Sequence, residues 1–102
     1  MKLSIVIPAH NEEKRIESTL REYVGFFEML RKKDVLDYEI IVVLNACTDN
    51  TLSVVESAKK GLRKVKILDF KQGGKGFAVK KGFEEALIGD GDLIGFVDAD
   101  MA

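Results

Sequence analysis

The sequence predicts an α/β fold: an open, mostly parallel sheet of about four strands with helices on both faces. Short β-branched segments alternate with longer segments whose apolar residues recur at helical spacing, in the order β-α-β-α-β-α-β. The first strand segment is almost continuously apolar, which is typical of a parallel strand covered on both faces. This alternation favours right-handed crossovers and therefore a single sheet.

The predicted strands are short and apolar. They are residues 3–8, 38–44, 65–70 and 93–97. Pro8 lacks a backbone N–H, so strand pairing is expected to end at this residue. The third strand alternates between apolar and polar residues at its start, which indicates a position at the edge of the sheet. The fourth strand leads directly into Asp98.

The segments between the strands are predicted helices, at about residues 12–33, 50–62 and 76–88. Asn11 stands where an N-cap of the first helix is expected, and Thr48 or Asp49 could cap the second. The third helix is expected to approach the sheet closely at Gly82. Its predicted buried residues are Ala78, Val79, Phe83, Ala86 and Leu87.

The composition argues against several classes of function. The 102 residues are 46% hydrophobic and 32% charged, which suits one folded domain or part of one. With 16 basic and 17 acidic residues the net charge is −1, so no nucleic-acid partner is expected. The single Cys47 can form no internal disulfide, and no Cys/His cluster suits zinc. We expect no signal peptide or membrane span in this chain, and a cytoplasmic location.

Polar residues follow every predicted strand. These strand ends are residues 8–12, 45–49, 70–75 and 98–100. In an open parallel sheet the ligand crevice lies beyond the carboxyl ends of the strands, so these segments should share one edge. They bring together carboxylates, an asparagine, a histidine, a lysine and the amino termini of helices. The sequence therefore predicts one polar binding site at this edge.

Asp98 and Asp100 are the candidate metal ligands. Their spacing puts both carboxylates on the same side of an extended segment, where they would repel each other unless a cation lay between them. Mg²⁺ or Mn²⁺ suits such ligands, and Mg²⁺ often binds one or two carboxylates together with substrate phosphates. The alternative is a solvated acidic turn that closes the strand.

The segment Gly73-Gly74-Lys75-Gly76 is a candidate phosphate-binding loop before a helix. It is not a Walker A loop, because Gly76 stands where Ser or Thr is required. The alternative is a flexible turn followed by a helix that packs closely at Gly76 and Gly82.

Three further residues at this edge have simpler interpretations. Glu12 could cap its own helix or accept hydrogen bonds from a nucleoside. His10 is the sole histidine, and we do not assign it as a base. Cys47 has no base near it in the sequence and is interpreted as a small packing residue.

Four blocks of the sequence resemble the family 2 glycosyltransferases, and the dolichyl-phosphate mannose or glucose synthase type looks most similar. The blocks are Ser4–Glu12, Ile41–Thr51, Gly74–Gly82 and Phe96–Asp100. They stand in the family's order and cover essentially the whole chain. In this family the nucleotide-binding half is the Rossmann-like half of a GT-A fold.

The resemblance implies roles for particular residues. Glycosyl transfer would run from a GDP- or UDP-linked sugar to a lipid-phosphate or saccharide acceptor, with Asp98 and Asp100 binding Mg²⁺ or Mn²⁺. Val43 and Asn45 would contact the base or ribose. The implied nucleotide-binding residues are Pro8, His10, Glu12, Val43, Asn45, Lys75, Asp98 and Ala99.

The chain departs from the family pattern in two respects. Asn45 stands where the family usually has aspartate, and because an amide can donate as well as accept, the choice of nucleobase is open. The family's acceptor half and catalytic base would lie beyond residue 102. We therefore predict that residues 1–102 form the nucleotide-sugar-binding part of a GT-A domain that is incomplete at its C-terminus.

Two other interpretations are open for the whole chain. One is a non-catalytic nucleotide-binding or regulatory module of the same fold that needs a partner chain. The other is a flavodoxin-like or receiver-like domain, which is disfavoured because a receiver has acidic residues where Pro8-Ala9-His10 stand.

Residues 93–97 would form an uncovered apolar edge and a route to a homo-oligomer. For the full-length protein, association with the cytoplasmic face of a membrane is an alternative to a freely cytoplasmic location.

Overall fold

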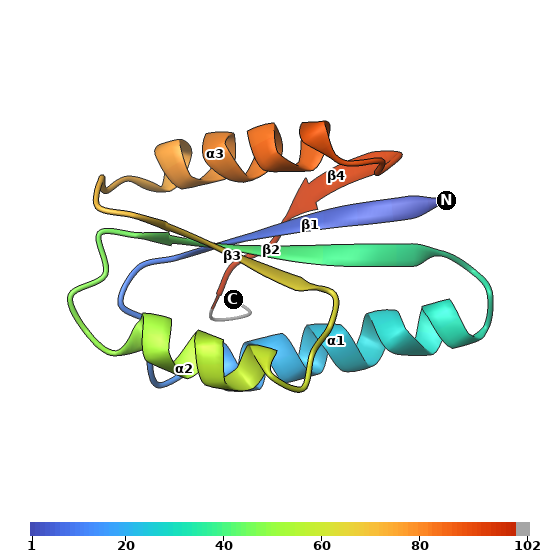
Figure 1. The fold of residues 1–102 in the computed structure, drawn as a ribbon, viewed down its shortest axis with the longest axis horizontal. Coiled ribbons are helices and arrows are strands. Elements are labelled where there is room, and N and C mark those ends of the chain that lie inside the picture. Colours follow the sequence, from blue (N-terminus) through green and yellow to red (C-terminus); the bar gives the residue numbers. More distant parts are fainter. Residues whose placement is uncertain (100–102) are drawn as a thin grey trace.

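The computed structural model describes residues 1–99, which form one four-stranded sheet and three helices (Figure 1). The strands are β1 (Lys2–Ala9), β2 (Asp37–Asn45), β3 (Val65–Phe70) and β4 (Leu93–Phe96), and the helices are α1 (Ile16–Lys32), α2 (Thr51–Lys59) and α3 (Lys75–Ile88). The strand order is β3-β2-β1-β4, and every pairing is parallel. The predicted fold class is confirmed, as is the edge position of β3.

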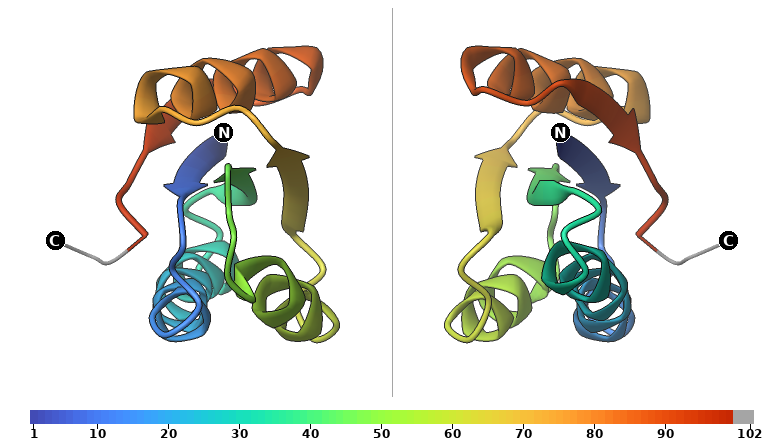
Figure 2. Two further views of the ribbon diagram at one scale, coloured as in Figure 1. Left: turned by 90° about the vertical axis from the view of Figure 1, so that its left-hand side faces the viewer. Right: turned by 90° about the vertical axis from the view of Figure 1, so that its right-hand side faces the viewer.

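Helices cover both faces of the sheet. α3 lies on one face and the pair α1 and α2 on the other, and the end-on views in Figure 2 show the sheet between these layers. Alternate residues of each central strand supply the two cores, because side chains in a strand point to opposite faces. In β1, Ile5 and Ile7 pack on the α1 side and Val6 on the α3 side. No helix within residues 1–99 is long and apolar enough to cross a membrane.

Pairing of β1 continues past Pro8 to Ala9, so the prediction that it would end at Pro8 was wrong. The Val6 carbonyl accepts a hydrogen bond from Val97 N–H at 3.0 Å, so the backbone of Val6 faces the β4 side. Pro8 lies two residues on and faces the same side, where β4 has already ended. Its missing N–H therefore costs no bond to β2.

The start of α1 differs from the prediction, because the helix begins at Ile16 rather than near Glu12. Residues 12–15 form a turn in which the Glu12 carbonyl accepts from Arg15 N–H at 3.0 Å and Ile16 N–H at 2.8 Å. Asn11 is not the N-cap. It adopts a φ of 52°, and its side chain turns to another loop. This geometry could not be read from the local pattern, because its partners lie more than 30 residues away.

The third helix packs on the sheet through small residues, as predicted for Ala78, Gly82 and Ala86. A Cβ added to Gly82 would lie 2.3 Å from Val6 Cγ1, so the helix approaches the sheet more closely than any other residue type would allow. Leu87 is 73% exposed, contrary to the prediction, and a Cβ on Gly76 would meet nothing within 4 Å. Of Gly76 and Gly82, the two glycines predicted to pack closely, only Gly82 does so.

Strand β4 pairs with β1, and within residues 1–99 no strand covers its other edge. Leu93 and Phe96 on this strand are 54% and 50% exposed. The predicted apolar edge is therefore present.

Candidate functional site

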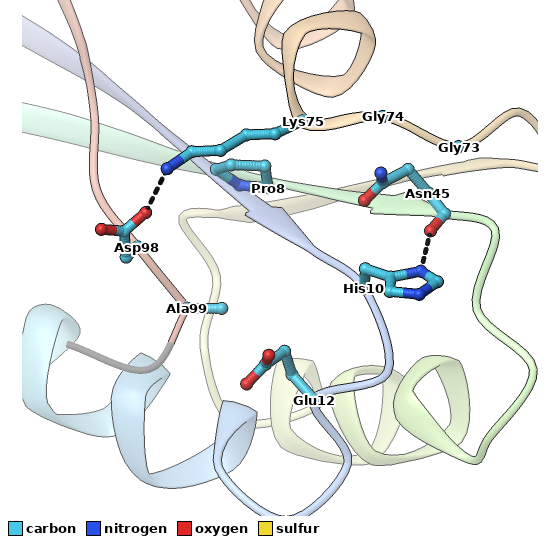
Figure 3. Close-up of a pocket in the computed structure, with 9 residues that line it drawn as sticks. All are labelled: Pro8, His10, Glu12, Asn45, Gly73, Gly74, Lys75, Asp98 and Ala99. Atoms are coloured by element: carbon cyan, nitrogen blue, oxygen red, sulfur yellow. Dashed lines mark hydrogen bonds and ion pairs between the residues drawn. The ribbon is translucent and has the colours of Figure 1, made fainter. Parts of the chain in front are cut away.

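A cavity of about 730 Å³ opens at the carboxyl edge of the sheet (Figure 3). Its walls come from the ends of β1 and β2, the loop before α3 and the segment after β4. The lining residues are Pro8, His10, Glu12, Asn45, Gly73, Gly74, Lys75, Asp98 and Ala99. The strand ends thus meet as the sequence predicts, and the volume is that of a typical small-molecule site.

The lining includes all but one of the predicted nucleotide-binding residues. The exception is Val43, which is fully buried beneath α3 and has Gly82 against its side chain. Val43 and Asn45 face the same side of β2, but the helix covers only the first of them. Gly73 and Gly74, part of the candidate phosphate loop, join the lining. Asp100, the second predicted metal ligand, lies outside the described residues.

His10 is fixed across the ends of β1 and β2. Its Nδ1 lies 2.8 Å from the carbonyl oxygen of Asn45. A carbonyl oxygen can only accept, so Nδ1 carries the hydrogen, and Nε2 of the neutral ring is left as an acceptor. The ring therefore presents a defined hydrogen-bonding atom beside the cavity.

The side-chain amide of Asn45 is available to a ligand. The residue is only 4% exposed, yet its amide hydrogen-bonds to nothing in the part of the chain that the structure describes, and Figure 3 shows it at the cavity wall. The amide offers one donor group and one acceptor to a molecule in the cavity.

Glu12 points into the cavity in Figure 3 and does not cap its own helix. Its carboxylate accepts from Arg15 Nε at 2.8 Å and Arg15 Nη2 at 3.0 Å, a two-pronged contact that fixes its direction. The Glu12 N–H donates to Thr51 Oγ1 at 2.9 Å. The remaining lone pairs of the carboxylate can accept hydrogen bonds from a ligand.

A set of hydrogen bonds joins the loop after β1 to the loop after β2. Asn11 Oδ1 accepts from the N–H of Thr48 at 2.8 Å and of Asp49 at 3.3 Å, and Asp49 accepts from Glu13 N–H at 3.3 Å. Burial alone would raise the pKa of the Asp49 carboxyl, but the hydrogen bonds from Thr51 and Glu13 outweigh it and lower that pKa. The N-cap of α2 is Asn50 rather than Thr48 or Asp49, so that prediction was wrong, although Asp49 Oδ1 accepts a hydrogen bond from Thr51 N–H at 3.0 Å. These contacts hold the two loops that carry Glu12 and Asn45.

The opposite wall of the cavity is suited to an anion. Within residues 1–99 no side chain caps helix α3, which begins at Lys75, so its first backbone N–H groups are available to a ligand in the cavity that Lys75 lines. Gly74 precedes it with a φ of 103°, a conformation that favours glycine. The positive end of the helix and the ammonium group of Lys75 together favour a phosphate.

Asp98 forms an ion pair with the ammonium group of Lys75. Lys75 Nζ lies 2.7 Å from Asp98 Oδ1 and 5.6 Å from the centre of the Phe96 ring. A carboxylate that faces a cavity and attracts a positive charge there suits a divalent cation, particularly beside a phosphate site. Within residues 1–99 no group of three or more His, Cys, Asp or Glu side chains could hold a metal alone, so Asp98 is the one predicted ligand that the structure places.

Comparison with known proteins places this site in a family. The sequence model of the family described as glycosyl transferase family 2 matches residues 4–102. The chain belongs to this family. The sheet and helices are those of the predicted Rossmann-like part of a GT-A fold.

Curated members of the family include relatives that align with almost the whole chain. A dolichyl-phosphate beta-glucosyltransferase of Drosophila melanogaster is 39% identical over 106 residues, covering 100% of this chain and 32% of that protein. The enzyme of the same name from Dictyostelium discoideum is 38% identical, covering 98% and 31%. The chain therefore spans about a third of the length of these relatives.

Two solved structures share the fold. A mannosyltransferase from Pyrobaculum calidifontis, in complex with GDP-Man and Mn²⁺, superposes with a TM-score of 0.77 at 24% identity, covering 96% of this chain and 27% of that one. A glucosyl-3-phosphoglycerate synthase from Mycobacterium tuberculosis, in complex with Mn²⁺, UDP and phosphoglyceric acid, gives 0.66 at 25% identity, covering 96% and 32%.

Proposed function

We propose that this chain binds a nucleotide-diphospho-sugar together with Mg²⁺ or Mn²⁺, as the N-terminal part of a glycosyltransferase. The proposal rests on one observation: the cavity has neutral and acidic hydrogen-bonding groups on one wall and a lysine with an open helix terminus on the other. In a nucleoside diphosphate, the nucleoside suits the first wall and the phosphates suit the second.

The nucleoside half is assigned to the wall made by His10, Glu12 and Asn45. Base and ribose carry both donors and acceptors, and this wall offers an imidazole nitrogen, a carboxylate and a free amide. Asn45 can donate and accept, so the wall suits either guanine or uracil. The structural relatives in complex with GDP-Man or with UDP are consistent with both.

The diphosphate half is assigned to Lys75, Gly74 and Asp98. Lys75 and the α3 terminus would contact phosphate oxygens, and Asp98 would hold the metal ion together with Asp100. A bound Mg²⁺ or Mn²⁺ neutralises charge on a departing nucleoside diphosphate. Because Lys75 contacts Asp98, the pair must separate for both groups to bind their ligands.

The acceptor is proposed from the relatives. Their names specify dolichyl phosphate, so a lipid phosphate is the acceptor we propose for the whole protein. The catalytic base for that step is expected outside this chain. The alternative of a non-catalytic nucleotide-binding module of the same fold predicts the same binding and no transfer by any longer form of the protein.

Binding titrations test the proposal. UDP-glucose and GDP-mannose are titrated by calorimetry with and without Mn²⁺. For one of them we expect the affinity to be at least about tenfold higher with the metal than without it. Asp98→Asn should remove most of this gain, and Lys75→Met should weaken binding with or without Mn²⁺. Asp69→Asn, at an exposed aspartate that does not line the cavity, is the matched control.

The outcomes separate the parts of the proposal. Failure of both nucleotide-sugars to bind contradicts the function itself. Binding that Mn²⁺ does not change contradicts the metal assignment alone, and an Asp98→Asn variant that behaves like Asp69→Asn contradicts the role of that carboxylate.

A further inference from the structure

The segment that carries Asp98 is fastened to the body of the protein on both sides of this residue. On one side, Val97 N–H donates to the Val6 carbonyl at 3.0 Å. On the other, the carbonyl of Ala99 accepts a hydrogen bond from the hydroxyl of Thr19, in helix α1. These contacts join residues about 80 or more positions apart, and no sequence pattern indicated them.

The Thr19 contact is buried and specific. Thr19 is 2% exposed and Ala99 is 6% exposed. In a helix a threonine hydroxyl commonly bonds back to a carbonyl of its own preceding turn. Here it donates to another segment, and no second donor to the carbonyl of Ala99 lies among residues 1–99. Loss of such a bond is costly because the carbonyl cannot recover water.

The side chains of this segment divide between the core and the cavity. Val97 and Ala99 pack against the core on the α1 side, and Asp98 and Ala99 both line the cavity. The two hydrogen bonds lie on either side of Asp98, so they fix the course of the backbone at this residue and the position from which its carboxylate reaches the cavity. The anchoring bond therefore acts on the carboxylate without touching it.

We infer that Thr19 is a positioning residue for the carboxylate segment, holding Asp98 where a metal-bound diphosphate would lie. The inference rests on the proposed function for the identity of the ligand, but the anchoring contact itself is independent of it. Metal ligands are commonly oriented by such supporting hydrogen bonds, whose loss typically costs 10- to 100-fold in metal affinity or activity.

Two substitutions isolate the hydroxyl. Thr19→Val keeps the shape of the side chain and removes the donor, whereas Thr19→Ser keeps the donor. A third variant, Val65→Ala, shortens a buried core residue at the start of β3 and controls for a general loss of stability. All three are studied in the complete chain, with unfolding midpoints measured alongside.

The first readout is the ratio of nucleotide-sugar affinities with and without Mn²⁺. We expect Thr19→Val to lower this ratio about tenfold relative to the unsubstituted protein and to leave metal-free binding nearly unchanged. Thr19→Ser should retain most of the ratio, and Val65→Ala all of it. A Thr19→Val ratio equal to that of Val65→Ala overturns the inference.

The second readout needs no metal and no nucleotide. Amide hydrogen exchange is followed in a peptide that covers residues 93–99, whose Val97 N–H is protected by its bond to Val6. We expect faster exchange in Thr19→Val than in Thr19→Ser or Val65→Ala, and equal exchange overturns the inference. If the unsubstituted protein shows no Mn²⁺ effect while exchange responds as expected, the metal assignment fails but the anchoring role stands.

Discussion

The replacement Gly82→Ala is the sharpest test of how α3 sits on the sheet. Gly82 is buried, and a Cβ there would lie 2.3 Å from Val6 Cγ1, 2.9 Å from Val6 Cγ2 and 3.1 Å from Val43 Cγ2. Carbon atoms in ordinary contact are about 3.5–4.0 Å apart. Both methyl groups of Val6 are in the way, so no rotation of that side chain clears the space. Val6 is fully buried in a strand paired on both sides, and the helix must therefore move outward.

The magnitude follows from two opposing terms. Overpacking a close-packed core costs about 1–3 kcal/mol, and a displacement above 1 Å belongs at the upper end. Alanine in a helix interior is better than glycine by about 1 kcal/mol. The net expectation is a loss of about 2 kcal/mol in the free energy of unfolding, or roughly 10 °C in melting temperature for a domain of this size.

Urea denaturation measures this directly, provided the m-value is unchanged. The matched control is Gly25→Ala, an exposed glycine inside α1 whose added Cβ would meet nothing within 4 Å. It should stabilise the protein by about 0.5–1 kcal/mol, the opposite sign. A Gly82→Ala variant as stable as the unsubstituted protein would refute the packing argument, and Val6→Ala in the same chain should recover part of the loss.

Two further predictions concern acid stability and self-association. Hydrogen bonds from Arg31 and Tyr38 lower the pKa of Glu28 from 4.5 to about 2, so this carboxylate stabilises the fold above pH 4.5 and its contribution is lost as the pH falls toward 2. Glu28→Gln should lower the free energy of unfolding by about 1 kcal/mol at pH 7, a modest loss because the Glu28–Arg31 ion pair is partly exposed. In this variant the free energy of unfolding should also fall less steeply between pH 4.5 and pH 2. Equal pH profiles of the two proteins in urea titrations would contradict this. We also propose that the open β4 edge supports a homo-oligomer, so Leu93→Lys should reduce concentration-dependent association in size-exclusion chromatography, and a clean monomer at high concentration before substitution would argue against it.

The local sequence was sufficient for the order of elements. Continuous apolar runs mark strands covered on both faces, and β3 was predicted at residues 65–70, the bounds that the structure shows. Because parallel strands share one carboxyl edge, the order alone brings Pro8, Asn45, Lys75 and Asp98 to one cavity. These features depend on hydrophobic periodicity and chain direction, which can be read from the sequence of each segment alone.

The elements' ends and the contacts within the site required the tertiary structure. Asn11 looked like a helix cap, but its side chain finds better-placed donors in the loop after β2, so α1 starts later. Val43 looked like a site residue, but α3 covers it because glycine lets the helix approach. The bond from Thr19 to Ala99 spans 80 residues. The sequence by itself determined which segments form strands and helices and which edge of the sheet holds the site, since these features follow from local patterns. Only the tertiary structure decided which side chains face the cavity and which contacts hold them. Those contacts form between segments that are far apart along the chain, and no sequence pattern indicates which of these segments meet.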